Sequence, residues 1–485
     1  SEVFIIPGLQ EEERAAVQKR SDQVLRALQG LHVQAKQAPV IAVLGSGGGL
    51  RAHIAYLGVL SELRRQGLLD AVTYLAGVSG STWAMSSFYA KDGNTEDIEA
   101  ELKRRFDQRE WDWRRSLEET VRSARTLENY SLTDFWAYLV VSKQTRELQD
   151  SHLSSMKTCV DEGMMPYPIF AAIDNDLHAA WQKEKSQKTW FEFTPHHAGY
   201  PALRAYVAAT HFGSQFTEGR MVRQEPERDL TFLRGLWGSA LASLEEIKKF
   251  IWDQLSSLTV EGDAGEPDHS WMTEVIQNWS QISPEEQEQF LEHPTFGDYF
   301  TFLLKTGICC FKWEWGTTHN FLHKHGDIED LAMHSRELLH LVDAGFAINT
   351  PYPLVLPPVR HVHLILSFDF SAGDPFETIR ATADYCQQHG IPFPPVGEPE
   401  LQECSRAPRS CHILRGAGGP VVMHFPLFNT DSCGDEIQSW MDRYGTFQLA
   451  DSYSVDMVTQ LLEVSKKNVE INKMNILREI KNVAR

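Results

Sequence analysis

The sequence predicts an α/β fold with a mainly parallel central sheet flanked by helices. Two short apolar runs carry this prediction, residues 39–44 (PVIAVL) and residues 72–76 (VTYLA). A segment of helical length, residues 50–66, separates them and is followed by Gly67. Strand-length runs rich in Val, Ile and Tyr on either side of a helix are typical of a β-α-β unit with parallel strands.

A loop follows each of these two predicted strands. The first loop is glycine-rich, residues 45–49 (GSGGG), and the second is the short turn of residues 77–81 (GVSGS). A crossover connection places the carboxyl ends of both strands at one edge of the sheet, where α/β folds bind their ligands. We therefore expect the two loops to lie side by side and to form a site.

Further elements are predicted along the rest of the chain. We expect helices over residues 11–34 and from about residue 451 to the carboxyl terminus, because apolar residues recur there at helical spacing. Additional strands are expected at residues 167–174, 190–194, 338–343, 362–368 and 420–425.

The composition is that of a globular protein and narrows the classes of partner. Of the 485 residues 42% are hydrophobic, and the formal net charge is -20. Because nucleic acids are bound by basic faces, we exclude a nucleic-acid partner. No apolar run approaches the roughly 20 residues of a membrane-spanning helix, and the amino terminus lacks the pattern of a signal peptide.

The seven cysteines are spread thinly along the chain, with no CxxC motif and no Cys or His spacing typical of zinc. Scattered thiols in an odd number favour a reducing compartment. We therefore expect a cytoplasmic protein with unpaired, mostly buried cysteines and with no metal site.

The one compositional break lies in residues 261–296, which are acidic and poor in apolar residues. The segment before it carries apolar side chains at helical spacing between Ile247 and Leu258. Together these segments fit a lid with an apolar underside, and they fit equally a solvated loop beside an ordinary amphipathic helix. Composition leaves both alternatives open.

Ser79 lies where the second predicted strand turns into a helix. Such a turn, with small neighbours, is typical of a nucleophile elbow, whose serine Oγ stands free above the sheet. The usual pattern ends in Gly, whereas this one ends in Ser81. A turn that merely caps a helix would use the same small residues, so the turn by itself does not establish a nucleophile.

The glycine loop exposes backbone N–H groups at the positive end of a helix, where an anion can bind. A Walker loop is excluded, because Leu50 and Arg51 stand where Lys and Ser or Thr are required. A dinucleotide site is disfavoured, because the acid about 20 residues further on, Asp70, precedes the second strand instead of ending it. The remaining anion is the oxyanion of an acyl transfer, held opposite Ser79.

Arg51 follows directly on the glycine loop. A guanidinium suits a substrate phosphate or carboxylate, because its planar fork of donors matches either group. An ordinary surface salt bridge is the alternative.

A serine hydroxyl needs a base, and the sequence offers two kinds. Histidine is the usual choice, but the chain has 19 histidines and none stands out. The alternative is a carboxylate whose pKa is raised by partial burial, and Asp343, at the end of a predicted strand, is the best placed. Spacing does not decide between them. The histidines near expected strand ends or loops are His53, His211, His340, His363 and His424.

Several short motifs, taken in order, resemble one family. They are residues 46–51 (SGGGLR), 77–83 (GVSGSTW), 342–345 (VDAG), 349–353 (NTPYP) and 367–371 (SFDFS). The pattern resembles the catalytic domain of the cytosolic (group IV) phospholipases A2, which are patatin-like lipid acyl hydrolases. The resemblance runs from about residue 7 to residue 483 and is greatest to the gamma type, which has no calcium-binding C2 domain.

The resemblance implies a site in which serine and aspartate act as a dyad with no histidine. It also implies amide donors for the oxyanion and arginines near a substrate phosphate. The implied residues are Ser79 as nucleophile, Asp343 as base, Gly48 and Gly49 as oxyanion donors, and Arg51 and Arg360 at the phosphate.

The resemblance further implies a patatin-like α/β fold with a nucleophile elbow. Residues 1–485 would form a single catalytic domain without a C2 domain, with residues 246–297 as an inserted lid or cap. The implied activity is that of a calcium-independent phospholipase A2 and lysophospholipase that needs no cofactor and can also transfer the acyl group to a lysophospholipid. Its partners would be phospholipids and lysophospholipids at a membrane surface, with the protein in the cytoplasm and peripherally bound to intracellular membranes.

Three other functions compete with this one. They are a histidine-dependent esterase of small soluble esters, a lipid-binding protein without catalysis and, more distantly, a dinucleotide-dependent oxidoreductase. A serine-directed fluorophosphonate would label Ser79 only if that serine is an active nucleophile.

Overall fold

The computed structural model describes most of the chain. The described residues are 2–108, 111, 113–240, 245–246, 248–249, 253, 283–285, 297–445 and 453–484. Residues 246–297, where we expect either a lid or a surface loop, lie almost wholly outside the described residues.

Five parallel strands form the centre of the main sheet, in the order β4, β3, β2, β12, β14. Nearly all of their residues are buried, as expected for parallel strands covered by helices. All five lie where the sequence predicts strands, so the mainly parallel central sheet is confirmed. Their bounds are β2 Ile41–Gly45, β3 Tyr74–Gly77, β4 Tyr167–Asp174, β12 Leu364–Asp369 and β14 Val421–Pro426.

Antiparallel strands extend both edges of this centre. The sequence predicts only β5 among them. A separate two-stranded ribbon pairs β8 (Gln215–Thr217) with β9 (Arg220–Arg223). The edge strands are β5 Trp190–Phe193, β6 His197–Tyr200, β7 Ala205–Ala208, β1 Val3–Ile5 and β13 His412–Leu414.

The strand β11 (Leu338–Val342) brings a distant part of the chain to the end of β3, while its other edge pairs with β10 (Thr317–His319). β11 runs antiparallel to the last residues of β4, with Val342 opposite Ile173, whereas β3 pairs with β4 only as far as Phe170. β5 pairs with the opposite edge of β4 as far as Ile173, so β11 must pair with the same edge of β4 as β3 does. The carboxyl end of β11 therefore faces the carboxyl end of β3. The chain therefore leaves β11 at the turn that follows β3.

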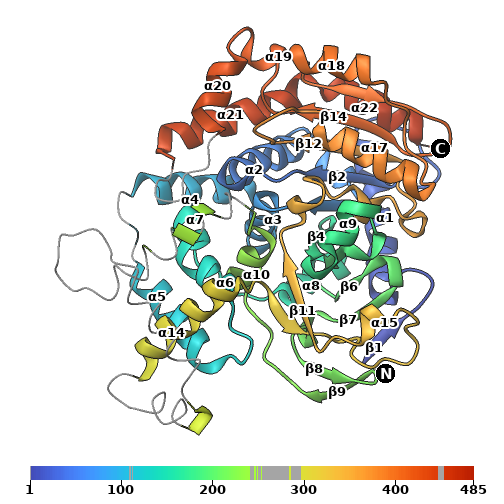
Figure 1. The fold of residues 1–485 in the computed structure, drawn as a ribbon. Helices are drawn as coiled ribbons and strands as arrows, with labels where there is room; N and C mark the ends of the chain where they lie inside the picture. Colours follow the sequence, from blue (N-terminus) through green and yellow to red (C-terminus); the bar gives the residue numbers. More distant parts are fainter. Residues whose placement is uncertain are drawn as a thin grey trace.

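Helices cover the sheet. The helix α2 (Gly49–Arg65) begins at the glycine loop and packs against α3 (Gly80–Ala90) and α21 (Val455–Ile471). Figure 1 shows the carboxyl-terminal helices, from orange to red, gathered on the side of β12 and β14. Among the described residues, the other helices of eight or more residues are α1 Glu11–Gly30, α4 Thr95–Asp107, α5 Trp113–Thr126, α10 Leu230–Trp237, α14 Gly297–Lys312, α17 Glu377–His389, α18 Glu398–Arg406, α20 Ile437–Tyr444 and α22 Lys473–Val483.

Two expectations drawn from composition can be compared with the structure. All seven cysteines are unpaired, and four of them are buried. In the part of the chain that the structure describes, no helix is both long and apolar enough to span a bilayer.

The closest approach between the two loops lies at Gly80. A Cβ at this position would lie 1.9 Å from the carbonyl oxygen of Gly49, so the Gly80→Ala protein can fold only if the two loops move apart. Overpacking typically costs about 1–3 kcal/mol, and we expect the upper end here because backbone cannot yield as a side chain does. Urea-induced unfolding measures the loss.

The matched control for this prediction is Gly326→Ala, because a Cβ on Gly326 meets no atom within 4 Å. We expect its unfolding midpoint to equal that of the unmodified protein. Equal midpoints for the two variants would show that the loops are not in contact.

Candidate active site

Ser79 sits at the sharp turn between β3 and α3. Its φ is 54° and its ψ is -123°, a conformation that non-glycine residues rarely adopt and that costs energy. Two hydrogen bonds hold the turn: the amide of Val78 donates to the carbonyl of Gly45 at 3.1 Å, and Ser81 Oγ donates to the carbonyl of Ser46 at 2.5 Å. The strained serine is therefore tied to the glycine loop on both sides.

Asp343 follows β11 directly, and its side chain is fully buried. Its Oδ1 accepts a hydrogen bond from the amide of Gly345 at 2.8 Å, and its Oδ2 accepts one from the amide of Ala240 at 3.0 Å. Burial raises the pKa of Asp343 to about 6, against the lowering effect of these two amides and of the nearby Ser79 hydroxyl. No arginine or lysine among the described residues forms a salt bridge with this carboxyl.

The hydroxyl of Ser79 is buried and available for reaction. It is close enough to Asp343 to lower the pKa of that carboxyl, yet its Oγ makes no hydrogen bond of ordinary geometry with any described residue. None of the candidate histidines hydrogen-bonds to Ser79 or Asp343 within the described residues. Three of them have other partners: His340 bonds Asp176, His363 accepts from the amide of Val40, and His424 bonds the carbonyl of Pro375.

The glycine loop faces Ser79. A Cβ on Gly47 would lie 3.1 Å from the Cβ of Ser79, which places the loop against the serine. Gly48 and Gly49 have φ values of 152° and 56°, which favour glycine. Their amide N–H groups, at the start of α2, donate to no described residue. The site therefore combines a hydroxyl, a carboxyl and two unpaired amide donors, which are the groups that an acyl transfer through serine requires.

Arg51 lies at the edge of the same loop and is buried. Its Nε donates to the carbonyl of Phe370 at 2.7 Å and its Nη1 to the carbonyl of Tyr444 at 2.9 Å. Its Nη2 donates to no described residue and would lie 2.7 Å from a Cβ on Gly48. Arg51 therefore forms no salt bridge with a described carboxylate, and one arm of its guanidinium borders the loop.

Arg360 does not lie at this site. Its guanidinium is buried against Tyr74, at the amino end of β3, whereas Ser79 follows the carboxyl end. Five hydrogen bonds to Glu13, Glu192 and the carbonyl of Leu354 satisfy the five N–H donors of the arginine. The sequence-based prediction that Arg360 meets the substrate phosphate does not fit this geometry, because no donor is left for a ligand.

The turn that supports Asp343 has no role assigned to it from the sequence. Ser239 and Ala240 follow α10, where the small residues of 236–240 suit either tight packing near a cleft or a merely structural turn. Ser239 Oγ accepts a hydrogen bond from the amide of Asp343 at 3.1 Å, and the amide of Ala240 donates to its carboxyl. The small residues after Trp237 are the feature of the sequence that could have indicated this contact, because they allow the backbone to approach the buried carboxyl.

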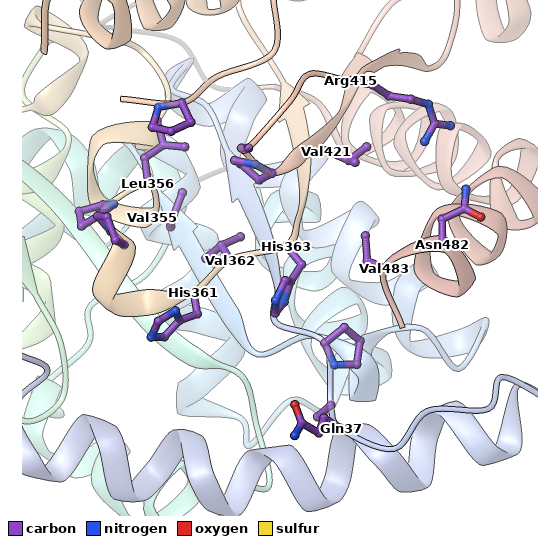
Figure 2. A pocket seen from close by; sticks show the side chains of 18 residues that line it. Gln37, Val355, Leu356, His361, Val362, His363, Arg415, Val421, Asn482 and Val483 are labelled. Carbon is purple, nitrogen blue, oxygen red and sulfur yellow. The ribbon is translucent and has the colours of Figure 1, made fainter. Parts of the chain in front are cut away.

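A cavity of about 680 Å³ lies elsewhere, at the amino ends of the parallel strands (Figure 2). It is lined by residues that directly precede or begin β2, β12 and β14, among them Pro39, His363 and Val421, and by Val483 near the carboxyl terminus. Since Ser79 and Asp343 lie at the carboxyl ends of the strands, this cavity is separate from the candidate active site.

We expect Arg360→Ala to destabilise the protein by about 3–5 kcal/mol, because Glu13 and Glu192 would remain buried without their counter-ion. Chemical denaturation measures the loss. Arg14→Ala is the matched control, because Arg14 pairs with Glu11 on the surface, where an ion pair contributes about 1 kcal/mol at most. A stable Arg360→Ala protein with weakened binding of phospholipid would instead restore the arginine to the substrate site.

Comparisons with known proteins show which family the chain belongs to. A family model described as the lysophospholipase catalytic domain matches residues 41–377. Human cytosolic phospholipase A2 gamma is 60% identical over 524 residues, covering 100% of this chain and 97% of that protein. The mouse protein of the same name is 56% identical over 547 residues, covering 98% of this chain and 92% of its own length.

Solved structures give the same result. Human GIVD cytosolic phospholipase A2 matches with a TM-score of 0.74 at 26% sequence identity, over 100% of this chain and 68% of that chain. Its complex with methyl gamma-linolenyl fluorophosphonate matches with a TM-score of 0.69 at 25% identity, over 100% of this chain and 66% of that chain. With a family model over most of its length and near full-length relatives, the chain belongs to the cytosolic phospholipase A2 family and is a phospholipid ester hydrolase.

Proposed function

We propose that this chain is a calcium-independent phospholipase A2 and lysophospholipase in which Ser79 is the nucleophile and Asp343 the base. One observation carries the proposal: the buried carboxyl of Asp343 adjoins the hydroxyl of Ser79 at a strained turn. Among the described residues the carboxyl has no cation beside it, and the hydroxyl has no other partner. A carboxyl in this setting holds a proton at a pKa near working pH, so it can both accept and return one.

The proposed reaction begins when Ser79 Oγ attacks the acyl carbonyl of a glycerophospholipid. Asp343 takes the hydroxyl proton as the new C–O bond forms, and the amides of Gly48 and Gly49 donate to the oxyanion. When the intermediate collapses, the bond to the glycerol oxygen breaks and Asp343 returns the proton to that oxygen. The products are a lysophospholipid and an acyl-serine.

The acyl-serine is then cleaved by a second acceptor. Water gives up a proton to Asp343 as it attacks, and the proton passes to Ser79 Oγ as the fatty acid leaves. A lysophospholipid hydroxyl in place of water would give transacylation, because both acceptors meet the same intermediate. A lysophospholipid entering the first step as substrate gives the lysophospholipase reaction.

Arg51 is proposed to meet the substrate phosphate with its Nη2 arm. The carbonyls of Phe370 and Tyr444 occupy its Nε and Nη1, which fixes the plane of the guanidinium at the edge of the glycine loop. An arginine so held presents a charged donor near Gly48 without having to lose side-chain freedom on binding. Calcium independence belongs to the proposal, because the amides and Arg51 supply partners for each negative charge.

The relatives support the proposal in two ways. The human and mouse relatives at 60% and 56% identity are named cytosolic phospholipase A2 gamma, which fits a cytoplasmic protein that acts at a membrane surface. The related human GIVD enzyme has been solved in complex with a lipid-like fluorophosphonate, a class of reagent that reacts with activated serines. Peripheral binding to intracellular membranes completes the proposed setting.

Labelling with a fluorophosphonate tests the nucleophile directly. In a buffer containing EGTA, we expect one adduct per chain on Ser79 by peptide mass spectrometry, together with release of fatty acid from phospholipid vesicles. Ser79→Ala should carry no adduct, and Asp343→Asn should lose at least about 10³-fold in kcat, because a triad-type base contributes on this scale. An adduct elsewhere, or activity that requires calcium, would refute the proposal.

The pH profile tests the base. Because Asp343 must be unprotonated to accept the serine proton, kcat/KM should fall as the pH drops through about 6. The midpoint should hardly move between two temperatures, because carboxyl ionisation has little enthalpy, whereas the pKa of an imidazole falls on warming. A midpoint that shifts with temperature would identify a histidine as the base.

A further inference from the structure

Asn349 holds Gly47 at two points. Its backbone carbonyl accepts a hydrogen bond from the amide of Gly47 at 3.0 Å, and its Nδ2 donates to the carbonyl of Gly47 at 3.1 Å. A Cβ on Gly47 would lie 2.2 Å from Asn349 Oδ1 and 3.1 Å from the Cβ of Ser79. Gly47 is therefore confined between the side chains of Asn349 and Ser79.

The side-chain hydrogen bond fixes more than Gly47 itself. The carbonyl of Gly47 and the N–H of Gly48 belong to one planar trans peptide group, so they point in opposite directions. With its carbonyl directed to Asn349 Nδ2, this peptide must direct the N–H of Gly48 away from Asn349. If the peptide flipped, the carbonyl oxygen of Gly47 would take the place of the donor and would repel an oxyanion.

A second, longer contact agrees with this orientation of the Asn349 amide. The hydroxyl of Ser371 donates its proton to Asp369 Oδ1 at 2.7 Å, so its oxygen is left to accept a hydrogen bond from Asn349 Nδ2 at 3.3 Å. The nitrogen end of the amide therefore meets the Gly47 carbonyl at the shorter distance and Ser371 at the longer one. Asp369 itself is buried at the end of β12, which anchors this arrangement to the sheet.

We infer that Asn349 is a positioning residue, which orients the Gly48 N–H toward the developing oxyanion without touching the reacting atoms. The inference rests on the proposed function, because it assumes that Gly48 donates to an oxyanion on the ester bound by Ser79. It explains why a half-buried asparagine stands between the glycine loop and the loop that follows Asp343, where its Oδ1 would also lie 3.1 Å from a Cβ on Gly345.

The test compares Asn349→Ala and Asn349→Leu with the unmodified enzyme on a phospholipid ester. Loss of one oxyanion donor typically lowers kcat by roughly 10²–10³-fold. In the Asn349 variants the Gly48 N–H should point away from the oxyanion for only part of the time, so we expect kcat to fall by about 10–100-fold. We expect KM and the pH midpoint near 6 to stay unchanged, because Asp343 keeps its contacts with Gly345 and Ala240. The Leu variant is nearly isosteric, carries neither a charge nor a donor, and keeps the test valid if the Ala variant folds poorly.

Two further variants serve as controls. Ser371→Ala removes the weaker contact of Asn349 and spares the hydrogen bond to Gly47, so it should keep kcat within about fivefold, which is the factor that a single contact of about 1 kcal/mol allows. Asn482→Ala changes an exposed asparagine at the far cavity and should behave as the unmodified enzyme. Unfolding midpoints and the amount of fluorophosphonate adduct on Ser79 report whether each variant is folded.

The outcomes are distinct. A loss in kcat for both Asn349 variants, with KM, pH midpoint and unfolding midpoint unchanged, supports the inference. It is overturned if either folded variant keeps its kcat, if the pH midpoint moves, or if Ser371→Ala loses as much as Asn349→Ala. Failure of the unmodified enzyme to cleave the ester or to carry the adduct on Ser79 would remove the proposed function and the inference with it.

Discussion

The antiparallel pairing of β11 with the last residues of β4 is the constraint on which the candidate active site depends. β4 is longer than β3, and β11 uses the edge that β3 leaves free. This pairing places Asp343 in front of the turn that carries Ser79, although the two residues lie 264 positions apart in the sequence. Once there, the carboxyl is enclosed on all sides, and its pKa follows from that enclosure more than from any single neighbour.

Some buried carboxyls in this protein pair with an arginine and others do not, and this difference changes their pKa. Glu13 and Glu192 are paired with Arg360, and the arginine holds the pKa of Glu13 below its usual value against the effect of burial. Asp343 is equally buried but receives only amide and hydroxyl donors, so its pKa rises to about 6. A carboxylate paired with a buried arginine stays ionised, whereas a buried carboxyl without a salt bridge, such as Asp343 or Asp369, whose pKa burial raises to about 7, can exchange a proton near neutral pH.

Local signals in the sequence were sufficient for the parts of the site that lie within one β-α-β unit. The strands around residues 41–45 and 74–77, the glycine loop and the turn at Ser79 all follow from runs of apolar and small residues. The position of Asp343 relative to Ser79 could not be read in this way, because it depends on strand pairing between distant segments, and only the resemblance to a known family supplied it. The resemblance failed at Arg360. A position in a motif does not show whether the N–H groups of a guanidinium are already used by other residues.

The orientation of the amide groups in the glycine loop depends on both local and distant parts of the chain. Peptides flanked by glycines turn easily, so a loop that is flexible enough to adopt φ values of 152° and 56° needs outside contacts to keep its N–H groups directed at one point. Ser81 holds the peptide before Gly47 and Asn349 holds the peptide after it. Because both contacts come from segments that also carry Ser79 or follow Asp343, the hydroxyl, the carboxyl and the amide donors share one frame. Preorganisation of this kind lets the donors act on a developing charge without first having to reorient.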